Sequence, residues 1–353
     1  MKFIHIADVH LGATPDSDMP WGADREKELW DSLYNVIELC NQNKVDLLLI
    51  AGDLFHKQPR LRDLKEVNYL FSKIETAEVV LMAGNHDYIG PRSYYPGFLW
   101  DARVHMFIKE EIDVIELPKL NTEIYGLSYH NRDITEPLYD SLKVGKQDKV
   151  QILLAHGGDE KNIPMNRKKL SVSGFDYIAL GHIHKPEIVG EKMAYAGSLE
   201  PLDKNETGER GYILGEITLD PIKKTMIRFI PGSLRQYKRL DLMIDKNTTN
   251  GSLVDKTKLL IQKQGSQHIY QFTIRGFREE DIHFDKQALL SLGNVLEVTD
   301  ETVPDYDFDQ LYQENEDNMI GLFIRRIREN VEQDEVAKKA LYYGLEALLN
   351  ARE

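Results

Sequence analysis

Acidic, amide and imidazole side chains follow the ends of five apolar segments in this sequence. Residues 79–83 (VVLMA) run through Gly84 into the triplet Asn85, His86 and Asp87. The arrangement recurs along the chain, and six of its 11 histidines take part in it. The other positions are Asp8 and His10, Asp53 and His56, His156, and His182 with His184. One histidine at a strand end is usually hydrogen-bonded within the fold, but five segments that end in this way indicate a metal site.

The residue types narrow the metal and its chemistry. Carboxylate, amide and imidazole donors without thiolates suit Mn, Fe or Zn ions. Calcium, in contrast, prefers a site made only of oxygen ligands. Cys40 is the only cysteine, which excludes an internal disulfide and a thiolate cluster. The donors outnumber the ligands of one tetrahedral ion, and two ions can share a carboxylate. Since two ions about 3.5–4 Å apart are typical of displacement at phosphorus, the residues predict phosphoryl chemistry.

Strands that alternate with helices predict how these side chains come together. The spacing of Leu29 and Leu33 predicts an amphipathic helix over residues 25–41, between apolar strands at 3–7 and 45–53. This βαβαβ start predicts parallel strands, whose carboxyl ends share one edge of the sheet. Later strands with few helices between them predict a second layer. Further elements are expected as a helix at 61–74, strands within 122–130, 150–158, 175–184, 192–198, 211–219 and 268–277, and helices at 286–292, 318–329 and 333–350.

Composition and charge limit the classes of function. The chain has 353 residues, 42% of them hydrophobic and 29% charged, which is ordinary for one large globular domain and a smaller one. No apolar run approaches about 18 residues and no leader precedes the first strand, so we expect a cytoplasmic protein outside the membrane. The net charge of −14 argues against a surface that grips polyanions everywhere. A basic run at 221–240 and an acidic run at 297–317 are expected to be solvated surface.

The polar motifs, taken together, resemble the full motif set of the calcineurin-like metallophosphoesterases. They are Asp8-Val-His10, Gly52-Asp53-Leu-Phe-His56, Gly84-Asn85-His86-Asp87, His156-Gly157 and Gly181-His182-Ile-His184. Their order and spacing match over roughly residues 1–200. The last histidine of GDLFH, and segments 195–214 and 235–242, resemble the branch that contains the nuclease subunits of SbcC–SbcD-type DNA-repair complexes. The resemblance implies an α/β fold, a four-layer αββα sandwich of two mixed sheets with a smaller C-terminal α+β cap.

The resemblance also implies roles for individual residues. It places one divalent ion on Asp8, His10, Asp53 and His184, and a second on Asp53, Asn85, His156 and His182. Asp53 then bridges two ions, with manganese expected before iron or zinc. His86 would lie beside the substrate phosphate, where a protonated imidazole stabilises charge and protonates the leaving oxygen. Asp87 would hold that imidazole in place, or only cap the loop. His56 would position the phosphate or its ester group, or only donate a supporting hydrogen bond.

Three functions are compatible with this motif set. The favoured one is a DNA exo- or endonuclease subunit of a DNA-repair complex, working with a coiled-coil ATPase of the SbcC type. The second is a phosphodiesterase or phosphatase that acts on small molecules or phosphoproteins, which the same ligands would serve. The third is a non-catalytic scaffold, against which the intact motifs argue. The sequence also leaves a homodimer open.

The sequence predicts three domains. A catalytic domain is expected at 1–235, a capping domain at 236–310 and a helical segment at 311–353. Segment 236–310 resembles in position the small capping domain that guides DNA in the nuclease branch. The two terminal helices carry apolar stripes at helical spacing. The stripes consist of Ile320, Ile324 and Ile327, and of Val336, Ala340, Leu341, Leu345 and Leu348. The favoured interpretation is that these stripes pack on the protein's own body, and the other is that they bind the ATPase partner.

Overall fold

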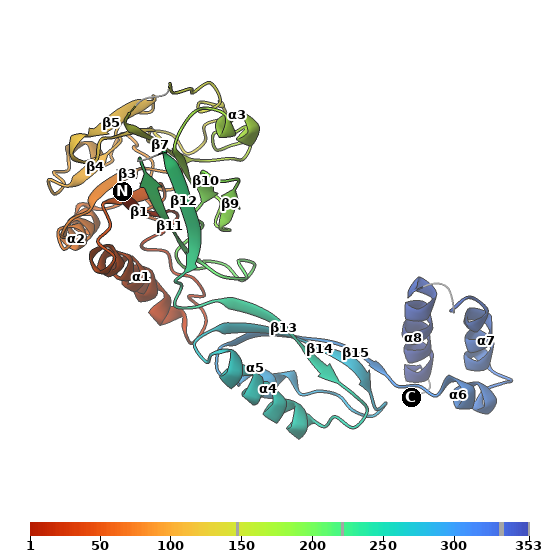
Figure 1. The fold of residues 1–353 in the computed structure, drawn as a ribbon. Helices are drawn as coiled ribbons and strands as arrows, with labels where there is room; N and C mark the ends of the chain where they lie inside the picture. Colours follow the sequence, from red (N-terminus) through yellow and green to blue (C-terminus); the bar gives the residue numbers. More distant parts are fainter. Residues whose placement is uncertain (146–147, 220–221, 332–334, 352–353) are drawn as a thin grey trace. The chain divides into compact units, whose positions relative to one another are not determined.

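The chain forms two compact units, Met1–Tyr237 and Lys238–Glu353, each of which is described by itself. The structure is a computed structural model, and it describes residues 1–145, 148–219, 222–331 and 335–351 (Figure 1). Of the helices within these described residues, none combines the length and the apolar character that crossing a bilayer requires.

Six strands form the first sheet of unit Met1–Tyr237, in the order β12-β11-β1-β2-β3-β4 (Figure 1). Their bounds are β1 Lys2–Ile6, β2 Leu47–Ala51, β3 Glu78–Met82, β4 Val104–Met106, β11 Gly211–Thr218 and β12 Lys224–Pro231. Strands β1 to β4 are parallel, while β11 is antiparallel to both β1 and β12. The predicted parallel βαβαβ start is therefore confirmed.

Six further strands form the second sheet, in the order β5-β6-β7-β8-β10-β9. Their bounds are β5 Asp113–Leu117, β6 Thr122–Gly126, β7 Val150–His156, β8 Tyr177–Gly181, β9 Glu187–Val189 and β10 Met193–Tyr195. The inner strands β6, β7, β8 and β10 are parallel, and the edge strands β5 and β9 are antiparallel to their neighbours. Both sheets are thus mixed, as predicted.

Alternating side chains of the central strands fill two different apolar layers. Leu48 and Ile50 of β2 pack in the cluster that includes residues of helices α1 (Gly22–Gln42) and α2 (Leu61–Phe71). Leu47 and Leu49 pack between the two sheets. Every residue of β2 is buried, which explains its continuous apolar sequence. Full burial of one such leucine contributes about 1.5–3 kcal/mol relative to exposure.

The outer face of the second sheet is covered by loops and one short helix. Leu153 of β7 and Leu180 of β8 pack there against Leu170 of α3 (Arg167–Ser171) and against the segment around Tyr139. The four layers of the predicted αββα sandwich are therefore present, and the fourth contains a helix of only 5 residues. Two 3₁₀ turns, η1 (Tyr95–Gly97) and η2 (Pro118–Leu120), lie in loops of the same unit.

Unit Lys238–Glu353 contains a three-stranded sheet of order β13-β14-β15 and two groups of helices. Its elements are β13 Tyr237–Ile244, α4 Asn250–Gln264, β14 Ile269–Arg278, α5 Lys286–Leu290, β15 Val295–Pro304, α6 Phe308–Glu314, α7 Met319–Val331 and α8 Glu335–Asn350. Leu253 and Ile261 of α4 and Leu289 of α5 pack on the sheet. Helix α4 was not predicted from the sequence. The division of this part into a cap at 236–310 and a helical segment at 311–353 stays a prediction.

The apolar stripes of the two terminal helices pack together. Ile320 and Ile324 of α7 and Leu341 and Leu345 of α8 are buried in one cluster with Tyr306. Ile327 and Leu348 pack on it in part, whereas the Val336 and Ala340 side chains are exposed. Packing on the protein's own body, the favoured interpretation of the stripes, is therefore confirmed for most of their residues.

The basic run is not simply solvated surface. Lys223 forms an ion pair of 2.9 Å with Asp176. Arg235 is 12% exposed and lies 2.6 Å from Glu28. The prediction of a solvated surface is wrong for these cations, because the strands that carry them place each beside an acid. In contrast, all nine acids of the run 297–317 are exposed, as predicted.

Candidate metal centre

The carboxyl ends of five strands bring the predicted side chains together. Asp8 and His10 follow β1, Asp53 and His56 follow β2, the triplet 85–87 follows β3, His156 ends β7, and His182 and His184 follow β8. Among the described residues, three sets in this region each offer ligand atoms that all lie within 4.8 Å of one another. The sets are Asp8, His10 and His184, then Asp8, Asp53 and His156, and finally His10, His56 and His86.

One group of donors surrounds the end of β1. The Nε2 atoms of His10 and His184 are 3.0 Å apart. Two imidazole nitrogens at this distance cannot both carry a hydrogen, so at least one lone pair faces the other ring. Asp8 is fully buried beside them and accepts the backbone N–H of His182 at 3.0 Å.

A second group of donors lies around the amide of Asn85. Its Oδ1 atom is 2.9 Å from His156 Nε2 and 3.1 Å from His182 Nδ1. Asp53 lies between the two groups, because its Oδ2 atom is 3.7 Å from His10 Nε2 and 3.5 Å from His156 Nε2. The structure thus places one carboxylate within reach of both sets of donors.

The backbone at these strand ends is held in an uncommon conformation. Asp8, His10, Asp53 and His182 have positive φ angles of 49°, 52°, 49° and 88°. Such conformations cost of order 1–3 kcal/mol each and persist where surrounding contacts enforce them. Asp8 N–H donates to Gly52 O at 3.2 Å and His10 N–H donates to Asp53 O at 3.0 Å, so the two strand ends hold each other.

Glycine is required where the motifs approach one another. A Cβ atom on Gly84 would lie 2.3 Å from Asp53 Oδ1 and 2.8 Å from His156 Nε2. At Gly52, which has a φ of 85°, it would lie 2.4 Å from His156 Nδ1. A side chain at Gly84 would therefore enter the space between the donors, and one at Gly52 would collide with the outer edge of the His156 ring.

The outward nitrogens of three of these histidines have hydrogen-bond partners. His156 Nδ1 is 2.8 Å from the carbonyl of Ala51. His182 Nε2 is 2.7 Å from Asp159 Oδ2, and His184 Nδ1 is 2.6 Å from Glu206 Oε1. Partners of this kind orient metal-binding histidines in proteins.

Asp159 and Glu206 were not among the predicted site residues. Asp159 has a weak sequence signal, because it follows His156 by three residues at the same strand end. Glu206 lies in segment 195–214, which resembles the nuclease branch, but nothing in that segment indicates that the loop after β10 brings it to His184.

Burial and mutual charge shift the pKa values of the donors. Burial lowers the pKa of His10 well below its usual value and also lowers that of His182, which favours neutral imidazoles with a free lone pair. Burial raises the pKa of Asp8 to about 6. Burial opposes charge on His156 as well, but the adjacent Asp53 carboxylate outweighs it and raises the pKa of His156 to about 9. The same interaction holds the pKa of Asp53 below its usual value against the effect of burial.

This donor set fits divalent transition-metal ions. It combines imidazole nitrogens, two carboxylates and an amide oxygen that converge at the strand ends. Because Asp53 reaches both groups, the arrangement suits two ions that share a carboxylate.

His56 and His86 lie beside the first group of donors. The His86 ring centroid is 4.8 Å from that of His10 and 5.2 Å from that of His56, on which it stacks. His56 Nδ1 is 3.4 Å from His10 Nδ1. Both rings are only partly buried, so they border the site from the solvent side.

The structure gives Asp87 different partners from those predicted. Its carboxylate accepts hydrogen bonds from the N–H groups of Gly84 (2.8 Å) and Phe55 (3.2 Å) and from the Tyr95 hydroxyl (2.8 Å). His86 Nδ1 instead lies 3.2 Å from the carbonyl of His56. The prediction that Asp87 holds the imidazole is wrong, because its side chain turns inward to tie the loops after β2 and β3. The alternative of loop capping describes its contacts.

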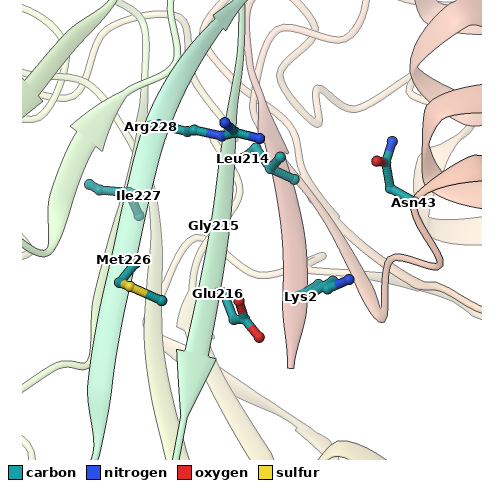
Figure 2. Close-up of a pocket in the computed structure, with 8 residues that line it drawn as sticks. All are labelled: Lys2, Asn43, Leu214, Gly215, Glu216, Met226, Ile227 and Arg228. Carbon is teal, nitrogen blue, oxygen red and sulfur yellow. The ribbon is translucent and has the colours of Figure 1, made fainter.

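A groove of about 380 Å³ lies at the opposite end of the first sheet (Figure 2). It is lined by Lys2, Asn43, Leu214, Gly215, Glu216, Met226, Ile227 and Arg228. Lys2 begins β1, whereas the candidate ligands follow the end of that strand. The labelled side chains are spread along the strands rather than aimed at one point (Figure 2).

Comparison with known proteins identifies the family. The model of the calcineurin-like phosphoesterase family matches residues 1–186, more than half of the chain. The chain therefore belongs to this family, and it is a metal-dependent phosphoesterase of a class that uses dinuclear metal centres.

Three relatives extend the comparison beyond the family model. Over 302 residues the chain is 28% identical to the uncharacterized metallophosphoesterase YhaO of Bacillus subtilis, covering 79% of this chain and 73% of that protein. It is 29% identical over 274 residues to the DNA double-strand break repair protein Mre11 of Methanocaldococcus jannaschii, covering 71% of each. The Mre11 protein of Archaeoglobus fulgidus is 27% identical over 259 residues, covering 64% of this chain and 56% of that protein.

Proposed function

We propose that this phosphoesterase is a nuclease that hydrolyses phosphodiester bonds of DNA. The observation that carries the proposal is the convergence of two donor groups on Asp53, the arrangement expected for two-metal hydrolysis of phosphate esters. Similarity to the Methanocaldococcus Mre11 protein, covering 71% of this chain, supports DNA as the substrate because it extends past the family match at residue 186.

The chain's own residues define the proposed metal ligands. One ion is assigned to Asp8, His10, Asp53 and His184, and the other to Asp53, Asn85, His156 and His182. Manganese is the expected metal, since mixed oxygen and nitrogen donors suit it. The ions would supply Lewis-acid activation of the phosphate and of the attacking water.

The two outer histidines are assigned to the substrate. His86 would donate a proton to the leaving oxygen, with its ring set by the His56 carbonyl at 3.2 Å. His56 stacks on His86 and would contact a phosphate oxygen at the solvent side. The backbone N–H of His86 donates to Asp53 Oδ1 at 2.9 Å, which fixes the main chain of the proposed acid beside the bridging carboxylate.

A DNA substrate also carries phosphates next to the one that reacts, and cationic side chains beside the site would bind them. Lys57 is exposed and directly follows His56, whose pKa is lowered by burial and then by the charges of His86 and Lys57. We assign Lys57 to a flanking phosphate of DNA.

The segment 236–310 would serve as a cap that guides DNA. A coiled-coil ATPase would bind the helices at 311–353, where Met319 and Leu322 of α7 expose apolar side chains.

A small-molecule or phosphoprotein substrate is the second candidate, and the charge distribution favours it. Of the basic run, Lys223 and Arg235 are paired with acids, and Lys238 donates to the Gln264 carbonyl at 2.9 Å. These cations have protein partners rather than open positions for phosphates. With a net charge of −14, the chain alone would bind DNA weakly and with strong salt dependence.

The proposal is tested by DNA cleavage and by competition with a nitrophenyl phosphodiester. In Mn²⁺ at low salt, the wild type is expected to cleave linear DNA, and DNA should inhibit ester hydrolysis less as salt rises. Asp53→Asn, purified in the same way, controls for contaminating nucleases. Lys57→Gln should lower the ratio of DNA to ester hydrolysis, whereas Lys65→Gln on the exposed side of α2 should not. If DNA neither inhibits nor is cut while the ester is hydrolysed, the small-substrate function replaces the nuclease.

A further inference from the structure

The two histidines of the motif His182-Ile-His184 present opposite ring nitrogens to the candidate metal centre. His182 directs Nδ1 toward Asn85 Oδ1, at 3.1 Å. His184 directs Nε2 toward His10 Nε2, at 3.0 Å. Because one nitrogen of each ring faces the candidate metal centre, the other nitrogen faces away from it. A hydrogen bond to that second nitrogen can hold the ring in place.

We propose that Glu206 and Asp159 are positioning residues that set the opposite tautomers of these two histidines, each serving a different metal ion. Glu206 would keep a hydrogen on His184 Nδ1, and Asp159 would keep one on His182 Nε2. The inference rests on the ligand assignment proposed above. Asp159 lies outside the segments that carry the resemblance, and Glu206 lies in segment 195–214, where the resemblance gives it no role.

The Glu206 carboxylate is fixed by its own loop. Oε1 lies 2.6 Å from His184 Nδ1, while Oε2 accepts the N–H of Leu202 at 2.9 Å. The backbone N–H of Glu206 donates to the Asp203 carbonyl at 2.8 Å, and Arg210 Nε lies 4.0 Å from Oε2. Both oxygens therefore have defined partners, and the side chain is only 19% exposed. A carboxylate held in this way can orient the His184 ring.

The Asp159 carboxylate divides its oxygens in a similar way. Oδ2 lies 2.7 Å from His182 Nε2. Oδ1 accepts the backbone N–H groups of Lys161 and Asn162, each at 2.8 Å. This turn begins three residues after His156, so it connects the carboxylate to a second candidate ligand of the same ion.

A carboxylate can only accept from an imidazole N–H, so it selects the tautomer whose lone pair is on the other nitrogen. With the wrong tautomer, the histidine would turn an N–H toward the ion and could not bind it. The Ala51 carbonyl, a neutral acceptor 2.8 Å from His156 Nδ1, selects the tautomer of His156 in the same way. The two carboxylates add negative charge, which raises the basicity of the rings they hold.

Mn²⁺ titration followed by the EPR signal of the free ion tests this assignment. Glu206→Leu and Asp159→Leu should each weaken binding of one ion by about 10- to 100-fold and leave the other ion within about threefold. Glu206→Gln keeps an acceptor oxygen and should recover part of the affinity. Glu209→Gln and Glu160→Gln, which remove exposed acids of the same segments, should match the wild type.

A double-mutant cycle separates positioning from a general structural role. In a His184→Ala background, Glu206→Leu should cause no further loss of Mn²⁺ affinity, because its effect passes through the missing ring. In a His182→Ala background, its full loss should remain. Asp159→Leu should show the reverse pattern. Equal losses in both backgrounds, or a loss of both ions from one substitution, would overturn the proposal.

The wild-type titration separates this inference from the ligand assignment. If the wild type binds two ions but Glu206→Leu and Asp159→Leu bind them unchanged, the positioning role is wrong and the ligand assignment stands. If His182→Ala and His184→Ala leave Mn²⁺ binding unchanged, the ligand assignment itself is wrong.

Discussion

The two ends of the first sheet both carry polar side chains, but they differ in burial and direction. At the carboxyl ends, Asp8 and Asp53 are 0% and 1% exposed, and their neighbours converge on one region. At the amino end of β1, the Glu216 side chain is partly buried and Arg228 is exposed along a shallow groove (Figure 2). Polar composition is therefore not what marks a functional site here. Convergence of buried donors, each held by a second partner, distinguishes the first end from the second.

Removing the charge of Asp53 should have the largest effect. Asp53→Asn weakens both proposed ions at once, and each ion stabilises the transition state by several kcal/mol. We expect kcat/KM for a nitrophenyl phosphodiester to fall by more than about 10⁴-fold. Metal content measured by elemental analysis should fall together with activity. Retention of two ions by Asp53→Asn would contradict its bridging position.

His86→Gln should separate chemistry from metal binding. Because the His86 ring borders the donor groups rather than joining them, the substitution should leave the metal content unchanged. Loss of a general acid is expected to lower kcat by about 10²–10⁴-fold. Steady-state kinetics and elemental analysis of the same preparation measure both quantities. A parallel loss of metal would show that His86 is a ligand.

Tyr95→Phe should affect stability more than catalysis. Its hydroxyl donates to the buried carboxylate of Asp87, and loss of such a hydrogen bond costs about 1–3 kcal/mol. Urea denaturation followed by tryptophan fluorescence reports this unit, since all 3 tryptophans precede residue 238. Tyr94→Phe, at a side chain 52% exposed, is the matched control. A fall in kcat as large as that of His86→Gln, with stability unchanged, would instead indicate that Asp87 acts through the imidazole.

Substitutions in the groove should have the smallest effects. Glu216→Gln on β11 and Arg228→Ala on β12 alter surface charge beside the amino-terminal half of β1. Stability is expected to change by no more than about 0.5 kcal/mol, and ester hydrolysis by no more than about twofold. A tenfold loss of activity from either one would remove the distinction between the two ends of the sheet.

Much of the fold follows from periodicity that is visible in the sequence. The central strands are apolar on both faces, and α1 carries a clear stripe, so both were predicted within a few residues. The helix α4 was missed because its buried stripe, Leu253, Thr257 and Ile261, has a polar residue at its centre. The Thr257 hydroxyl donates to the Leu253 carbonyl at 2.7 Å, which allows this polar side chain to be buried. Hydropathy alone does not show such a hydrogen bond.

The candidate site was predictable where its residues occupy strand ends. The structure brings the predicted donors together, and their roles as ligands stay predictions. The partners of these donors were not predictable, since Glu206 and Tyr95 reach the site through the folding of loops. The contacts of Asp87 were not predictable for a similar reason. Its sequence position allowed it either to hold the His86 imidazole or to cap the loop, and the orientation of its own side chain decides between the two.

The number and position of bound ions test the central claim most directly. Anomalous diffraction from crystals grown with Mn²⁺ would locate them without reference to activity. We predict two peaks about 3.5–4 Å apart on either side of the Asp53 carboxylate, one beside His184 and one beside His156. A single peak, or a peak held by His10, His56 and His86 instead, would contradict the account.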